Sequence, residues 1–310
     1  MNVPAMKIYI LDAFHKAGVD YAAKHAEVVR WDDPRVKNWV EDADAVMVRM
    51  TPLRAADIAR AKKLKIICKQ GVGVDTIDLE AAKAKGIPVS RTPGVNSEAV
   101  AELALALGLA ATRRVGELDR LVRAGAKIER PKFLGIEMLE KTVGVVGFGN
   151  IGSRVAHKWR SAFNARIVAY DPYKSDLPCQ QFSQLEKMLP EVDLLTLHTP
   201  LTAETRHMIG KRELALMKPT AVVVNASRGG VIDEAALYDA LKSGRLFGAG
   251  LDVWEVEPPP KDHPLLQLPN VVATPHAAGG TFDTQERSSL QVAQQVVEVL
   301  QGKAARNRVA

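Results

Sequence analysis

The sequence predicts an α/β protein built from two doubly wound parallel sheets. Short apolar runs typical of strands alternate with segments typical of helices. The alternation restarts near Thr142, which favours two domains over one very large domain. At this restart the strand-like run leads directly into a glycine-rich turn and then into a helix-like segment, residues 153–160.

The first series of strand-like runs precedes the restart and is separated by helix-like stretches. The runs occupy residues 7–11, 27–31, 45–49, 65–69 and 87–90. Helices are predicted at 55–61 and 79–85, and Gly86 stands where the second would end. A longer helix is predicted at 97–113, with Asn96 or Ser97 as its N-cap. Because it is apolar nearly all round, we expect it to be buried between other elements.

The second series follows a basic segment, residues 114–139, for which we expect irregular structure. Its strand-like runs occupy residues 142–146, 166–170, 194–197, 221–225, 248–253 and 271–274. A final helix is predicted at 284–300, and its periodicity alone does not say which domain it packs on.

Three glycines after the run 142–146 have the spacing G-x-G-x-x-G. Gly147 allows a sharp turn, Gly149 allows the backbone to approach a pyrophosphate, and Gly152 allows the helix to pack close to the strand. The phosphates would meet free N–H groups at a helix N-terminus. Asp171, nineteen residues after Gly152, can bind both adenosine ribose hydroxyls and repel a 2′-phosphate. The sequence therefore predicts a dinucleotide site that favours NAD over NADP.

Composition excludes several classes of protein. The 310 residues, 47% hydrophobic and 25% charged, are typical of an ordinary globular protein large enough for two domains. The net charge of +6 is scattered and aromatic residues make up only 5%, so we expect no nucleic-acid partner. The longest apolar stretch, residues 99–111, is too short for a bilayer. Residues 1–10 lack signal-peptide character, and we expect a cytoplasmic protein with no membrane partner.

Two cysteines and the C-terminal segment carry weaker signals. Cys68 and Cys179 give neither a disulfide framework nor a metal-ligand spacing, so we expect inert thiols and no metal. Residues 303–310 are polar, basic and terminal, and they are the one segment with a disordered character.

Three polar residues follow the ends of predicted strands in the second series. Arg228, Glu257 and His276 come after the runs that end near residues 225, 253 and 274. Taken singly, each is more typical of a solvated loop or turn. In a parallel sheet, however, all three lie at the edge where such sheets bind ligands. An imidazole that exchanges a proton, a carboxylate that orients it and an arginine that polarises a carbonyl suffice for hydride transfer to or from an alcohol.

Several ordered motifs resemble those of the D-isomer-specific 2-hydroxyacid dehydrogenases, in a short form without a regulatory domain after Leu300. The motifs are residues 147–152 with Asp171, 224–230, 251–258 and 273–276, preceded by 48–51, 71–75 and 96–102. The resemblance implies a Rossmann NAD-binding domain, residues 97–281, inserted in a flavodoxin-like substrate domain, residues 1–96 plus 282–310. It also implies a homodimer formed through the cofactor domains, with 114–139 reaching over the partner.

The resemblance also implies roles for individual residues. Arg228 corresponds to the substrate-binding arginine, His276 to the general acid/base and Glu257 to its carboxylate partner. The implied cofactor site is Gly147, Gly149, Asn150, Ile151, Gly152, Asp171, His198, Thr199, Pro200, Ala226, Ser227, Arg228, Asp252, His276 and Ala278. The implied substrate site is Arg49, Val72, Gly73, Arg228 and His276. Residues 198–200 are equally interpretable as a simple strand-end turn.

The expected activity is the NAD-dependent interconversion of a small D-2-hydroxy acid and its 2-keto acid. Glyoxylate, hydroxypyruvate, pyruvate, 3-phosphoglycerate and a sulfonated analogue all remain candidates. Arg49 and Arg54 could bind a second anionic group or could be solvated, and residues 124–127 lack a tryptophan common in the family. The alternatives are a formate- or phosphite-type dehydrogenase and an NAD(H)-sensing, corepressor-like interaction protein.

Overall fold

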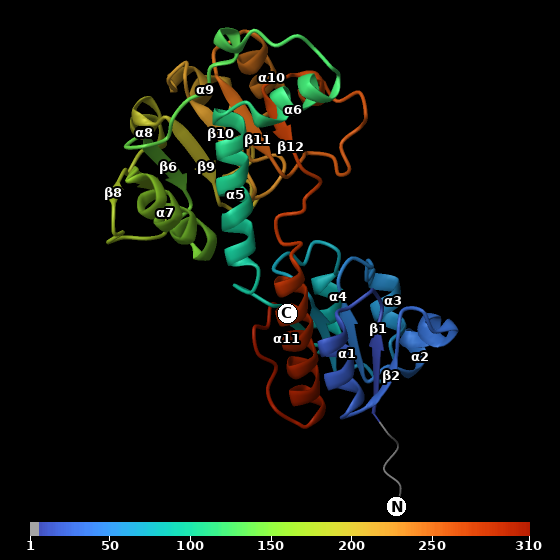
Figure 1. The fold of residues 1–310 in the computed structure, drawn as a ribbon. Coiled ribbons are helices and arrows are strands. Elements are labelled where there is room, and N and C mark those ends of the chain that lie inside the picture. Colours follow the sequence, from blue (N-terminus) through green and yellow to red (C-terminus); the bar gives the residue numbers. More distant parts are fainter. Residues whose placement is uncertain (1–5) are drawn as a thin grey trace, which may run out of the picture. The chain divides into compact units, whose positions relative to one another are not determined.

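The computed structural model describes residues 6–310, which form two compact units (Figure 1). The first unit comprises the chain up to Asn96 together with Gly280–Ala310, and the second comprises Ser97–Gly279. Residues 1–5 lie outside the described residues. They include the start of the expected substrate domain and half of the segment 1–10 that lacks signal-peptide character. The second unit was expected to extend to residue 281. The observed division is two residues earlier, after Gly279, and the Thr281 side chain caps the helix that follows, accepting from the N–H of Thr284 at 3.1 Å.

The first unit is built on a five-stranded parallel sheet. Its strands are β1 (Lys7–Ile10), β2 (Glu27–Val29), β3 (Ala45–Val48), β4 (Ile66–Lys69) and β5 (Val89–Ser90). Their order is β2-β1-β3-β4-β5, the flavodoxin-like doubly wound order. The strands are rich in valine and isoleucine because a sheet with both faces covered buries nearly every strand side chain.

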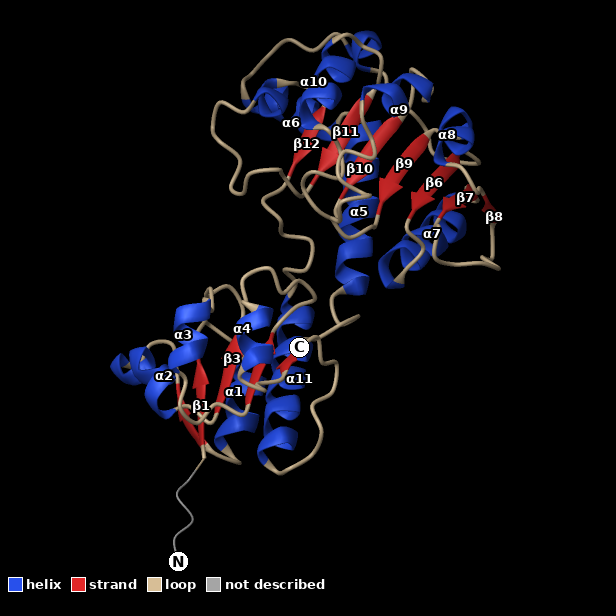
Figure 2. Cartoon of the chain, turned by 180° about the vertical axis from the view of Figure 1, so that it is seen from behind, coloured by secondary structure: helices blue, strands red, loops and turns tan. Residues whose placement is uncertain are grey.

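Helices cover both faces of this sheet, as Figure 2 shows. They are α1 (Lys16–Ala23), α2 (Trp39–Asp42), α3 (Ala55–Arg60), α4 (Leu79–Ala84) and α11 (Phe282–Leu300), with a 3₁₀ turn η1 (Pro34–Asn38). Ile8 and Ile10 point to the face covered by α11, whereas Tyr9 points to the face that packs on α3 and α4. Helices α1 and α11 pack so closely that a Cβ on Gly18 would lie 2.2 Å from the Ser289 hydroxyl oxygen.

The C-terminal segment corrects the expectation of disorder for residues 303–310. Arg308 pairs with Ser90 in an antiparallel bridge beside β5. The Val309 N–H donates to the Val89 carbonyl at 2.8 Å, and Val309 and Ala310 pack against the adjacent core. Composition suggested disorder because it takes no account of pairing with a distant strand.

The second unit contains a seven-stranded parallel sheet. Its strands are β6 (Thr142–Val146), β7 (Arg166–Tyr170), β8 (Gln180–Gln181), β9 (Leu194–Leu197), β10 (Val222–Asn225), β11 (Gly248–Leu251) and β12 (Val271–Ala273). Their order is β12-β11-β10-β9-β6-β7-β8. Counted from β6, this is the doubly wound order of dinucleotide-binding sheets extended by one strand, and the winding direction changes between β6 and β9.

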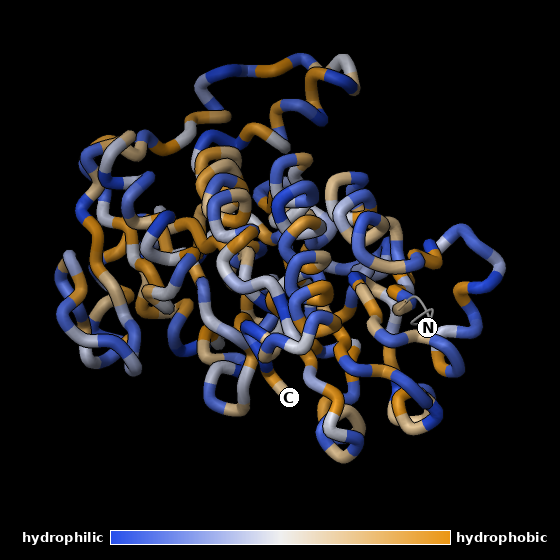
Figure 3. Tube along the Cα trace, turned by 90° about the horizontal axis from the view of Figure 1, so that it is seen from below, coloured by the Kyte–Doolittle hydropathy of each residue, from blue (hydrophilic) through white to orange (hydrophobic). Residues whose placement is uncertain are grey.

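Two helical layers enclose the second sheet. The helices are α5 (Ser97–Thr112), α6 (Val115–Arg123), α7 (Asn150–Phe163), α8 (Leu185–Met188), α9 (Lys211–Leu216) and α10 (Glu234–Lys242). Three 3₁₀ turns complete the unit: η2 (Arg130–Phe133), η3 (Leu189–Glu191) and η4 (Pro264–Gln267). Helices α5 and α7 pack on one face, around the fully buried Trp159, while α8, α9 and α10 pack on the other. Figure 3 shows helical traces that alternate between hydrophobic and hydrophilic residues.

The expectation of irregular structure throughout residues 114–139 was wrong, because this segment contains helix α6. Arg114 adopts a left-handed conformation, with a φ of 55°, and this separates α6 from α5. Within the new helix, Arg123 pairs with Asp119 at 2.9 Å, a favourable i,i+4 contact. The Arg120 guanidinium donates to the Pro269 carbonyl at 2.7 Å and attaches the helix to the chain just before β12.

Among residues 6–310, no helix is both long enough and apolar enough to cross a membrane. Both cysteines are free, and burial raises the pKa of the Cys68 and Cys179 thiols. Burial therefore disfavours the reactive thiolate at both positions, as expected for inert thiols.

Candidate active site

The carboxyl ends of the central strands of the second sheet lie in one row. The registers pair Val146 with Leu197, Leu197 with Asn225, Asn225 with Leu251, and Leu251 with Ala273. Each strand therefore ends level with its neighbours. The residues that follow these strand ends emerge side by side, at the edge where open parallel sheets bind ligands.

The glycine loop occupies the point on this edge where the winding direction changes. Gly147 has a φ of +83°, and a Cβ there would lie 2.6 Å from the His198 carbonyl oxygen. A Cβ on Gly152 would lie only 2.0 Å from the Gly147 carbonyl oxygen. A Cβ on Gly149, in contrast, would have no heavy atom within 4 Å. Two of the glycines thus allow close packing within the protein, and the third faces open space.

The remaining residues of the predicted dinucleotide site surround this loop. Asn150 and Ile151 are the first residues of α7, and Asn150 is exposed. The Asp171 carboxylate, at the end of β7, accepts from the backbone N–H groups of Phe148 at 2.8 Å and Tyr173 at 2.9 Å. Asp171 is therefore fixed beside the glycine loop, and each of its carboxylate oxygens can accept a further hydrogen bond.

His198 and Thr199 directly follow β9. Burial lowers the pKa of His198 to about 3, so its imidazole is neutral at physiological pH. One ring nitrogen, Nε2, lies 2.9 Å from the Thr196 hydroxyl, while the buried Nδ1 atom and the buried Thr199 hydroxyl have no partner among the described residues. Pro200 is exposed at the end of this turn.

The segment after β10 carries Arg228 and is held by Asn225. The Asn225 side chain accepts from the Ser227 N–H at 3.0 Å and from its hydroxyl at 2.7 Å, and it donates to the Arg228 carbonyl at 2.9 Å. Ala226 is buried in the core between these residues. The Arg228 guanidinium donates to the Ser227 carbonyl at 2.7 Å and is partly exposed.

His276 and Glu257 form a hydrogen-bonded pair in the loops that follow β12 and β11. The distance from His276 Nδ1 to Glu257 Oε2 is 2.7 Å, and both side chains are partly exposed. Glu257 Oε1 accepts from the Trp254 backbone N–H at 3.1 Å. Because a carboxylate only accepts hydrogen bonds, Nδ1 carries the hydrogen of this bond and Nε2 is left to exchange a proton with another molecule.

Asp252 stabilises the loop that carries His276. Its side chain is fully buried and accepts from the Thr274 hydroxyl at 2.6 Å and from the N–H groups of Ala277 at 2.8 Å and Ala278 at 3.0 Å. Its carbonyl accepts from the His276 N–H at 2.7 Å, where His276 adopts a left-handed φ of 54°. The observed partners of Asp252 thus hold the loop in a conformation that non-glycine residues rarely adopt.

Three of the residues predicted to bind the substrate, Arg49, Val72 and Gly73, belong to the first unit. Asp12 accepts from the backbone N–H groups of Arg49 at 2.5 Å and Thr51 at 3.1 Å, which fixes the turn after β3. Val72 and Gly73 lie in the segment after β4, and the Arg91 guanidinium donates to the Val72 carbonyl at 3.1 Å.

Arg54 is exposed at the start of α3. The roles of Arg49, Arg54, Val72 and Gly73 toward a ligand stay predictions.

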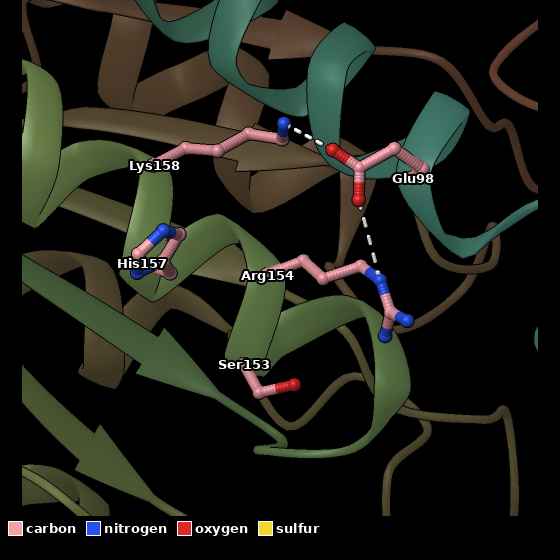
Figure 4. A pocket seen from close by; sticks show the side chains of 5 residues that line it. All are labelled: Glu98, Ser153, Arg154, His157 and Lys158. Carbon is pink, nitrogen blue, oxygen red and sulfur yellow. Dashed lines mark hydrogen bonds and ion pairs between the residues drawn. The ribbon is translucent and has the colours of Figure 1, made fainter.

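A pocket outside the predicted site is lined by helices α5 and α7 (Figure 4). In this view the side chains of Lys158 and Arg154 reach toward Glu98, and the Arg154 Nε–Glu98 Oε2 distance is 3.3 Å. The hydrogen bond from Lys158 lowers the pKa of the Glu98 carboxyl, as does the charge of Arg154. Ser153 and His157 complete the lining. These ion pairs join the first turn of α5 to the helix that begins at the glycine loop.

Asn225 and Trp254 were not among the candidate site residues, although both organise the site. An asparagine at the end of a strand is typical of a side chain that bonds to the backbone two residues later, so Asn225 had a local signal. The indole of Trp254 had none, because its bond to the Thr274 carbonyl depends on the tertiary fold.

Residues 105–278 match the family model described as the NAD binding domain of D-isomer specific 2-hydroxyacid dehydrogenases. The matched segment lies within the second unit and includes the glycine loop, Asp171, Arg228, Glu257 and His276.

Whole-chain relatives carry several names. The chain is 41% identical to the D-3-phosphoglycerate dehydrogenase of Methanocaldococcus jannaschii, with 98% of this chain but only 59% of that relative covered. It is also 41% identical to the glyoxylate reductase of Korarchaeum cryptofilum, with 98% of this chain and 95% of the relative covered. The D-lactate dehydrogenase of Aquifex aeolicus, solved with NAD and lactic acid, has a TM-score of 0.80 at 30% identity and 96% coverage of both chains.

The buried imidazole of His198 predicts an acid-sensitive contribution to stability. An unfolded histidine takes up a proton as the pH falls below about 6.5, whereas folded His198 does so only at about 3. The unfolded state therefore binds more protons between these values, and stability is lost as the pH falls. We expect His198→Gln to abolish about 2 kcal/mol of the loss in unfolding free energy between pH 7.5 and pH 5.

Urea unfolding at a series of pH values measures this difference, and His25→Gln, at an exposed position of the first unit, is the control for the loss of one histidine. An identical pH slope for the wild type and His198→Gln would contradict the burial of a neutral imidazole.

Proposed function

The chain belongs to the D-isomer specific 2-hydroxyacid dehydrogenase family, and from this premise we propose that it interconverts a small D-2-hydroxy acid and its 2-keto acid with NAD. The hydrogen bond of 2.7 Å between His276 Nδ1 and Glu257 Oε2 carries the proposal. It lies on the same strand-end edge as the glycine loop, so a proton-exchanging group and a dinucleotide site share one edge of one sheet.

The residues around the glycine loop fit a nicotinamide dinucleotide. The open space at Gly149 suits a pyrophosphate beside the N-terminus of α7. The fixed carboxylate of Asp171 suits two ribose hydroxyls, and its charge opposes a 2′-phosphate, which favours NAD over NADP. When bound, the nicotinamide accepts or supplies the hydride.

The chain's own residues supply the remaining chemistry. In reduction of a keto acid, His276 Nε2 gives a proton to the carbonyl oxygen, and in oxidation it takes the hydroxyl proton. Glu257 holds the ring so that Nε2 faces the reacting oxygen and stabilises the imidazolium that oxidation creates. The Arg228 guanidinium polarises the carbonyl and binds the substrate carboxylate through its paired N–H groups.

The substrate is a small anionic 2-hydroxy or 2-keto acid. The relatives are named for 3-phosphoglycerate, glyoxylate and lactate. These three acids share a carboxylate and differ in the group beyond it. We assign recognition of the shared carboxylate to Arg228, and the role of the backbone at Val72 and Gly73 stays a prediction from the resemblance. Arg49 and Arg54 are candidates for binding a second anionic group of the substrate. The residues of the site are compatible with either direction of the reaction.

A homodimer through the second unit is part of the proposal. Large apolar side chains are exposed within one segment of that unit, namely Val115, Val122, Leu134 and Leu139. Exposed apolar side chains of this kind favour a protein partner, and association of two copies would bury them. The cytoplasmic location expected from the sequence stays a prediction.

Replacing His276 with alanine removes the proposed general acid/base. We expect keto acid turnover to fall by about 10²- to 10⁴-fold, with the Kd for NADH unchanged. Steady-state kinetics and NADH fluorescence titration measure the two quantities. His25→Ala, at the exposed histidine of the first unit, is the matched control and should retain wild-type turnover. Turnover that survives in His276→Ala would exclude His276 from the chemistry.

Alanine substitutions at two glycines separate cofactor binding from folding. Gly149→Ala adds a methyl group in open space at an ordinary φ of −75°, so we expect a wild-type Tm but an NADH affinity at least about tenfold weaker. Gly152→Ala places the methyl group against the Gly147 carbonyl, so we expect a lower Tm. Calorimetry and NADH titration test the pair. Unchanged NADH affinity in Gly149→Ala would count against a pyrophosphate at this loop.

A further inference from the structure

Trp254 lies within the second unit at a point where three loops of the proposed active site meet. It follows β11 by three residues, is only 3% exposed and packs within the core on the α10 face of the sheet. The loops that carry Arg228, Glu257 and His276 each contact a different group of this residue.

The backbone N–H of Trp254 fixes the carboxylate of Glu257. It donates to Glu257 Oε1 at 3.1 Å, while the other oxygen, Oε2, lies 2.7 Å from His276 Nδ1. One carboxylate oxygen is thus held by the Trp254 backbone while the second meets the imidazole.

The indole of Trp254 holds the loop that carries His276. Its Nε1–H donates to the Thr274 carbonyl at 3.1 Å, two residues before His276. The ring itself is held by His263, at a centroid distance of 5.5 Å and an interplanar angle of 72°, and His263 Nε2 in turn lies 3.0 Å from Glu234 Oε2. A rigid ring thus places a hydrogen-bond donor under a loop in which His276 has a left-handed backbone.

The carbonyl of Trp254 limits the position of the loop that carries Arg228. A Cβ on Gly229 would lie 1.8 Å from the Trp254 carbonyl oxygen and 2.7 Å from the Glu255 nitrogen. The backbone directly after Arg228 therefore packs against the backbone of Trp254 with no room for a side chain.

We propose that Trp254 is a positioning residue that sets the mutual geometry of Arg228, Glu257 and His276. The proposal rests on the proposed function and assigns no contact with substrate to Trp254. The indole N–H is the part that a substitution can remove while the backbone contacts remain. Loss of the indole N–H leaves the Thr274 carbonyl without this donor and lets the His276 loop move. A misplaced catalytic group lowers the rate of the reaction but does not weaken cofactor binding.

The test compares Trp254→Phe with Trp159→Phe in a double-mutant cycle with His276→Ala. Trp159 is a fully buried tryptophan of the same unit whose Nε1 has no partner among the described residues, so its replacement removes an unpaired indole N–H. We expect Trp254→Phe to lower kcat about tenfold in the wild-type background, with NADH Kd unchanged, and Trp159→Phe to leave kcat unchanged.

In the His276→Ala background we expect Trp254→Phe to have no further effect, because the indole N–H that this substitution removes acts on rate only through the loop that carries His276. Equal losses in both backgrounds, a kcat unaffected by Trp254→Phe, or an equal loss in Trp159→Phe would each overturn the proposal.

If Trp254→Phe does not fold, His263→Leu replaces it in the same cycle. This substitution removes the edge contact on the ring and leaves every group of Trp254 in place, so we expect a loss of about threefold that again disappears in the His276→Ala background. Wild-type turnover of a 2-keto acid is measured first. Its absence overturns the proposed function together with this inference, whereas wild-type turnover with an additive cycle overturns this inference alone.

Discussion

The register of the seven-stranded sheet is the constraint on which the rest of the site depends. Parallel pairing in register brings Val146, Leu197, Asn225, Leu251 and Ala273 into one row, so the five chain segments that follow them emerge together. Residues far apart in the sequence thereby share one edge without any direct signal between them. The chemistry of the site is a property of these five strand ends, and the helices serve to bury the two faces of the sheet behind them.

Close backbone packing refines the arrangement that the register creates. Gly147 lets the glycine loop turn against the strand end at His198, and Gly152 lets helix α7 lie against the Gly147 carbonyl. Gly229 lets the loop after β10 lie against Trp254. The buried carboxylate of Asp252 gathers three donors from the last loop. Each of these contacts uses a group that costs stability if it is unsatisfied or displaced, so the loops have little freedom.

The sequence was informative where the signal is local. Runs rich in valine and isoleucine predicted the buried strands, and the glycine spacing predicted the turn before α7. Signals that depend on distant partners were lost. Helix α6 was not predicted because the basic composition of residues 114–139 was weighed without the ion pair between Asp119 and Arg123. Disorder was wrongly predicted for the C-terminal segment because its partner β5 lies more than 200 residues earlier. The bond from the Trp254 indole to the Thr274 carbonyl likewise arises only when β11 and β12 are side by side.

Reduction of a small 2-keto acid with NADH at the strand-end edge of the second unit is the proposal on which every other role depends. The most direct measurement is NADH consumption with glyoxylate, hydroxypyruvate, pyruvate, phenylpyruvate and phosphorylated or sulfonated three-carbon keto acids, with NADPH in parallel. We expect turnover of at least one of these acids, with NADH preferred because of the Asp171 carboxylate. Tight NADH binding with no turnover of any acid would contradict it and would favour a nucleotide-sensing protein that uses the same fold without its chemistry.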